Sequence, residues 1–90
     1  MDHCVHIVVK GMVQGVGFRY YVCHAARRLS LTGWVRNLPG GDVEIDVEGD
    51  HSSLEIFLHD VKVGPRSAHV KDLIIDWHPF ENNYASFEIL

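Results

Sequence analysis

The sequence has few cysteines and no long apolar run. Cys4 and Cys23 are the two cysteines among 90 residues, and they make neither a CxxC pair nor a zinc-site spacing. No apolar run approaches the roughly 18 residues that a membrane-spanning helix needs. The first residues lack the basic and apolar segments of a secretory signal. We therefore expect a cytoplasmic protein with reduced, structural cysteines, although spacing alone leaves a disulfide open.

Basic residues are also scarce. Lys and Arg number 8 against 12 Asp and Glu, so the formal net charge is -4 with the 7 histidines taken as neutral. Affinity for nucleic acid comes largely from a basic surface that neutralises phosphates. The charge balance therefore argues against a nucleic-acid binder. It leaves open a small anionic ligand, which a single local positive site can hold.

The length and composition indicate one folded domain over residues 1–90. Hydrophobic residues make up 47% and charged residues 22% of the chain, as in ordinary globular proteins, and 90 residues suffice for a single core. Apolar periodicity predicts strands and helices in alternation. Strands are expected over residues 4–10, 32–37, 43–48, 70–77 and 87–90, and helices over 18–29 and 54–61, the second started by a capping box of Ser52 and Glu55 and ended by Gly64-Pro65.

This β-α-β-β-α-β order with a short extra C-terminal strand predicts an α+β, ferredoxin-like fold. Two helices should pack on one face of an antiparallel sheet. Because this plan hosts many unrelated functions, the function has to be argued from a site.

Arg19 and Asn37 are expected to meet at one corner of that fold. A right-handed crossover makes the first two strands parallel. The helix over 18–29 advances roughly 18 Å at about 1.5 Å per residue, and the strand over 32–37 returns about 17–20 Å at about 3.3 Å per residue. These lengths nearly cancel, so Asn37 should stand beside Arg19 with the glycine-rich loop over 11–17 closing over both.

The residues at this corner suit phosphate. The start of a helix presents unpaired N–H groups and the positive end of its dipole, and Gly15 and Gly17 permit the loop to turn further N–H groups inward. Arg19 adds a planar fork that grips phosphate through two hydrogen bonds. Asn37 supplies a donor and an acceptor that can hold a water molecule. We predict a phosphate ligand attacked by water.

Two runs of the sequence resemble the signatures of the acylphosphatase family. Residues 11–19 resemble the first signature, G-x-V-Q-G-V-x-F-R, and residues 33–43 with Gly49 resemble the second, G-[FYW]-[AV]-[KRQ]-N-x3-G-x-V-x5-G. The resemblance spans nearly all of the chain, including residues 64–68. One departure is Gly17, where many animal members carry Phe or His. We expect it to alter the rigidity of the loop more than its chemistry.

The resemblance implies hydrolysis of the carboxyl–phosphate bond of a small-molecule acyl phosphate, without metal or cofactor. Inorganic phosphate would be product and inhibitor, and the protein a monomer with no nucleic-acid or membrane partner. By carry-over, Asn37 orients the attacking water, and the phosphoryl group is bound by Arg19 and the loop amides of Gln14, Gly15, Val16, Gly17 and Phe18. No side chain is an obvious general base, and a phosphate oxygen of the substrate could take the proton of the water. 1,3-Bisphosphoglycerate, carbamoyl phosphate and acetyl phosphate all present the required group.

Two non-catalytic alternatives use the same scaffold. One is a phosphate- or RNA-binding module, but RNA-recognition domains display aromatic residues on their central strands, and the first and third strands here carry none. The other is a phosphate sensor that binds without turnover. Hydrolysis of benzoyl phosphate separates both from the enzyme.

Other polar and aromatic residues are assigned structural roles. His3 and His6 point to opposite faces of a strand and cannot share an ion, the other histidines are expected at the surface, and Cys23 is expected to pack in the core. Three carboxylates are expected to form a solvated strand face: Glu44, Asp46 and Glu48. Three aromatic residues could either rim the site or pack in the core: Tyr20, Tyr21 and Trp34.

Overall fold

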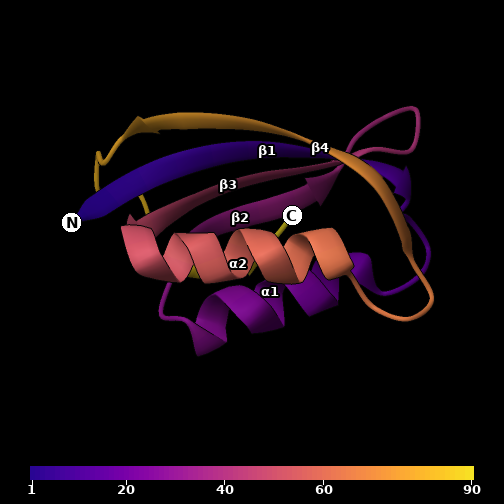
Figure 1. Cartoon of the computed structure of the whole chain (residues 1–90), viewed down its shortest axis with the longest axis horizontal. Helices are drawn as coiled ribbons and strands as arrows, with labels where there is room; N and C mark the ends of the chain where they lie inside the picture. The colour runs from indigo at the N-terminus through magenta and orange to yellow at the C-terminus, as the bar shows by residue number, and fades with distance from the viewer.

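In the computed structural model, which describes residues 1–90, the strands and helices follow one another in the predicted order (Figure 1). They are β1 (Asp2–Met12), α1 (Phe18–Arg28), β2 (Thr32–Asn37), β3 (Val43–Asp50), α2 (His51–Val63), β4 (His69–Pro79) and β5 (Phe87–Ile89). The ferredoxin-like α+β fold is confirmed, with β1 and β4 each longer than predicted. Neither helix is long and apolar enough to cross a bilayer.

The five strands form one sheet in the order β4-β1-β3-β2-β5. The pairs among β1, β2, β3 and β4 are antiparallel, but β5 runs parallel to β2, so the sheet is mixed and not wholly antiparallel as expected. The reason is topological. The chain leaves β4 at one edge and crosses in residues 80–86 to the opposite edge. There β5 runs opposite to β4 and therefore in the same direction as β2, its neighbour.

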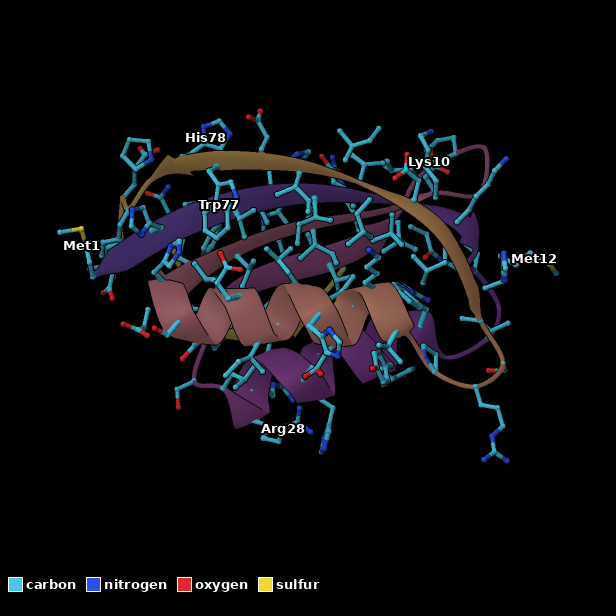
Figure 2. The ribbon with its side chains drawn as sticks, viewed as in Figure 1. Met1, Lys10, Met12, Arg28, Trp77 and His78 are labelled. Atoms are coloured by element: carbon cyan, nitrogen blue, oxygen red, sulfur yellow. The ribbon has the colours of Figure 1, made fainter.

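Both helices lie on the same side of the sheet, and the core fills the space between (Figure 1). Alternate residues of β1 and β3 face the helices and are fully buried, as period-two alternation requires: Val5, Ile7, Val9, Val43, Ile45 and Val47. Successive residues of β4 show the alternation directly, because Trp77 points toward the helix side and His78 away from it (Figure 2). The hydrophobic pattern of the strands therefore determines which face carries α1 and α2.

The start of α2 differs from the predicted capping box. Asp50, the last residue of β3, is the N-cap, and its carboxylate accepts hydrogen bonds from the N–H groups of Ser52 and Ser53. The Ser52–Glu55 box is wrong because the helix begins at His51, directly after the strand, and Asp50 satisfies these N–H groups first. The hydrogen bond from Ser53, followed by that from the N-terminal ammonium group, holds the pKa of Asp50 below its ordinary value.

The prediction that Glu48 belongs to a solvated strand face is also wrong. Its side chain is 1% exposed because residues 80–86 pass over it. The Oε2 atom accepts a hydrogen bond from Glu81 N–H (3.0 Å), and Oε1 accepts one from Asn83 N–H (2.8 Å). Glu48 therefore anchors the crossing segment that leads to β5.

Glu44, on the same outer face of the sheet, is also paired with neighbouring side chains. Glu44 lies 2.7 Å from His6 Nε2 and 2.6 Å from Arg36 Nε. Burial alone would raise the pKa of Glu44, but these two hydrogen bonds outweigh it and hold the pKa below its ordinary value.

Burial, together with the neighbouring carboxylate of Asp46, raises the pKa of Cys4 to about 12, so its thiol stays protonated at neutral pH. Both cysteines are free and buried.

Replacing Glu48 by alanine is expected to lower the free energy of unfolding by about 2 kcal/mol, since two main-chain N–H groups lose their acceptors. Glu48→Gln, which keeps one acceptor oxygen, should lose less. Urea unfolding followed by circular dichroism measures both, with the exposed Glu88→Ala as the control expected within about 0.5 kcal/mol of the parent protein. Equal stability of Glu48→Ala and Glu88→Ala would contradict the anchoring role.

Candidate functional site

The loop between β1 and α1, residues 13–17, is here called the cradle loop. Gly15 and Gly17 adopt left-handed backbone conformations, with φ values of 73° and 74°. A Cβ atom at either position would meet no atom within 4 Å. Glycine is therefore required by the backbone conformation and not by crowding, because other L-residues adopt this region at an energetic cost.

The cradle loop and the first turn of α1 present a continuous set of unpaired N–H groups. No main-chain N–H group from Gln14 to Tyr20 donates a hydrogen bond to the protein, and the first one that does, at Tyr21, donates to Gly17 O (3.1 Å). Gly17 is the N-cap residue and offers no side chain to satisfy them. The positive end of the helix is thus open to an anion.

Beside these N–H groups lies a hollow of about 100 Å³, here called the cradle hollow. It is lined by Val13, Gly15, Gly17, Phe18, Arg19, Tyr20 and Asn37. The structure thus brings Arg19 and Asn37 to one hollow, under the same loop, as the element lengths predict. The hollow lies at the end of the molecule where β1 finishes, the end marked by Met12 in Figure 2.

Gln14 and Val16, both predicted to contribute loop amides, do not line the cradle hollow. The Gln14 amide nitrogen donates to Leu38 O and Asp42 O, both at 2.8 Å, so its side chain ties the loop to the β2–β3 turn. The Val16 carbonyl accepts a hydrogen bond from Ser67 Oγ (3.1 Å). These bonds brace the cradle loop from two sides, and the unpaired main-chain N–H groups of both residues stay free.

Arg19 is half-buried in the first turn of α1. Its Nη1 donates to the main-chain oxygen of Leu90 at 2.9 Å, which fixes the direction of the side chain. No side-chain carboxylate lies within 4.0 Å of it. A guanidinium has five N–H donors, so the donors not directed at Leu90 remain available to a ligand.

Asn37 is the last residue of β2, and its exposed side chain makes no hydrogen bond within the protein. The strand supplies its position, since Asn37 pairs with Val43 in the β2–β3 ladder. A free carboxamide at the rim of the hollow can donate to one group and accept from another. This is what orienting a water molecule requires.

Of the three aromatic residues that could rim the site, only Tyr20 does. Its ring is 73% exposed beside the hollow, whereas Tyr21 donates to Asp60 O between the two helices (2.7 Å) and Trp34 donates to Tyr84 on the outer face of the sheet. Val13 also lines the hollow, a role that was not predicted from the sequence. Its position between the end of β1 and Gly15 could have indicated this role. No group of three His, Cys, Asp or Glu side chains is arranged to hold a metal ion.

Known proteins resemble this chain over nearly its whole length. The acylphosphatase family model matches residues 5–89. An acylphosphatase of Geobacillus kaustophilus is 42% identical over 86 residues, which cover 96% of this chain and 92% of that protein.

Solved structures show the same similarity. The crystal structure of acylphosphatase from Bacillus subtilis superposes with a TM-score of 0.95 at 38% identity, covering 100% of this chain and 99% of that one. An acylphosphatase from Coxiella burnetii gives a TM-score of 0.93 at 38% identity, covering 99% and 93%. The match extends over the whole fold, the cradle loop and the end of β2 included, and the chain belongs to the acylphosphatase family.

Proposed function

We propose that this protein hydrolyses acyl phosphates in the cradle hollow, with the phosphoryl group held by Arg19 and the cradle-loop amides and the attacking water oriented by Asn37. The observation that carries the proposal is the set of unpaired N–H groups from Gln14 to Tyr20, which opens beside both side chains. Such a set binds an anion, and the neighbouring carboxamide supports a reaction of that anion with water.

Binding of the phosphoryl group follows from charge and geometry. The N–H groups at the start of α1 and in the cradle loop direct partial positive charge at the hollow. The free donors of Arg19 can engage two phosphate oxygens at once. Because these donors are in place before the substrate arrives, little free energy is spent on organising them as charge develops in the transition state.

The reaction itself needs a positioned water. The water oxygen attacks phosphorus, the bond from phosphorus to the acyl oxygen breaks, and the carboxylate leaves with the bonding electron pair. The proton of the water passes to a phosphate oxygen of the substrate, so no protein base is required. Because a carboxylate is a good leaving group, positioning and charge stabilisation are sufficient to account for catalysis.

Hydrolysis of benzoyl phosphate tests the proposal. We expect the protein to release benzoate and inorganic phosphate, to do so equally after treatment with EDTA, and to be inhibited competitively by inorganic phosphate. A protein that binds phosphate without turnover would be a phosphate sensor on the same scaffold, and this result would overturn the proposal.

A further inference from the structure

A second hollow of about 350 Å³ adjoins the cradle hollow, in the groove between α1 and β5. It is lined by Tyr20, Cys23, His24, Arg27 and Ile89, and is here called the groove hollow. Tyr20 lines both hollows, so they lie end to end along α1, and the two together are here called the path. A ligand whose phosphate sits in the cradle hollow would reach the groove hollow by passing the exposed Tyr20 side chain.

The far end of this path is positively charged. Arg27 donates from Nη2 to Phe87 O at 2.9 Å, which fixes it against β5, and no carboxylate lies within 4.0 Å of it. The next residue differs: Arg28 is paired with Asp60 at 2.8 Å and lies at the outer end of α1 (Figure 2). Arg36 is likewise paired with Glu44. In a protein of net charge -4, Arg27 therefore lines the groove hollow without a carboxylate partner.

The middle of the path offers mostly apolar surface. Ile89 is partly buried and packs against the core, and the Tyr20 ring is largely exposed. The exposed side chain of His24 stands on the same side of α1 and has no hydrogen-bond partner in the protein. The path thus presents donors at Arg19, an apolar middle and donors again at Arg27, about 12 Å further along the helix at 1.5 Å per residue.

From this arrangement we infer that the groove hollow binds the acyl part of the substrate and favours acyl groups that carry a second anionic group, with Arg27 as its partner. The inference rests on the proposed function, since it places the phosphoryl end in the cradle hollow. The second anion is a carboxylate or a phosphate, and either chemistry fits a guanidinium. Tyr20 covers the connecting carbon atoms.

A pair of substrates that differ in one para substituent tests the inference. 4-Carboxybenzoyl phosphate carries the second anion on a rigid ring, and 4-methylbenzoyl phosphate matches its shape without the charge. We expect the parent protein to show a kcat/KM about tenfold higher for the carboxylate, as one charge-assisted contact provides. 4-Phosphonobenzoyl phosphate, used in parallel, distinguishes a preference for phosphate from one for carboxylate.

Substitutions assign the preference to Arg27. Arg27→Gln should lower the ratio of the two kcat/KM values about tenfold, to near one, while Arg27→Lys keeps the charge and most of the ratio. The ratio cancels any effect on β5 that both substrates share. Arg28→Gln, one residue further on and already paired with Asp60, is the matched control and should leave the ratio unchanged.

The outcomes separate the two proposals. If the parent protein hydrolyses neither substrate, the proposed function fails. If it hydrolyses both with equal kcat/KM, or if Arg27→Gln and Arg28→Gln give the same ratio, the proposed function stands and the anionic acyl site is overturned. Equal kcat/KM values for the two substrates in the parent protein overturn the anionic acyl site even if Arg27→Gln does not fold, and Arg27→Lys, which keeps the charge, then carries the assignment to Arg27.

Discussion

Arg19→Ala is expected to lower kcat/KM for benzoyl phosphate about a thousandfold and to abolish competitive inhibition by inorganic phosphate. The substitution removes the guanidinium that neutralises charge on the phosphoryl group and leaves only the main-chain N–H groups of the cradle loop. Losses of this size accompany removal of an arginine or a preorganised donor from a phosphoryl-transfer site. Steady-state kinetics and phosphate inhibition constants measure both effects.

Two further variants make this result specific. Arg19→Lys keeps the charge but not the planar fork, so we expect it to recover phosphate inhibition only in part. Arg66→Ala removes another arginine that has no carboxylate partner and should leave kinetics unchanged. Because Arg19 also donates to Leu90 O, circular dichroism should show that Arg19→Ala is folded. Phosphate inhibition equal to that of the parent protein would contradict the assignment.

Asn37→Ala is expected to lower kcat by about two orders of magnitude, or about 3 kcal/mol, while phosphate still inhibits. The reason is that the carboxamide contacts the water and not the phosphoryl group, so its removal affects the transition state more than the bound ground state. The side chain is exposed and makes no hydrogen bond within the protein. Stability to urea should therefore stay close to that of the parent protein.

The isosteric variant Asn37→Asp provides the contrast. It preserves the shape of the side chain but places a negative charge beside the phosphate. Phosphate inhibition should therefore weaken, and kcat should fall. The two variants therefore separate the loss of a positioned water from repulsion of the ligand. A kcat near that of the parent protein for Asn37→Ala would show that Asn37 does not orient the water.

Local patterns predicted most of the fold because they act within a few residues. The alternation of Val43, Ile45 and Val47 predicted β3 and its buried face, and the structure confirms both the strand and the burial of these three residues. The start of α2 shows the limit of such patterns. Asp50 and Ser52 are both good capping residues, and the choice depends on where β3 ends.

The meeting of Arg19 and Asn37 was predictable because a helix and a strand of matching length return the chain to the same end of the fold. The hydrogen-bond partners of the polar side chains around the site and on the outer face of the sheet were not predictable in this way. The sequence predicted only a role for the main-chain amide of Gln14, which is unpaired, and did not indicate that its side chain is hydrogen-bonded to the β2–β3 turn. Glu48 looks exposed on an alternating strand, yet residues 80–86 cover it.

The sequence by itself determined the order of the elements, the apolar faces of β1 and β3 and the glycine positions of the cradle loop, since all of these follow from short-range backbone preference and periodicity. Only the tertiary structure decided which charges remain free. Arg27 and Arg28 are adjacent in sequence, but one lies against β5 and the other is neutralised by Asp60 of α2. Pairing between distant residues depends on how helices and sheet edges pack, and no local pattern encodes it.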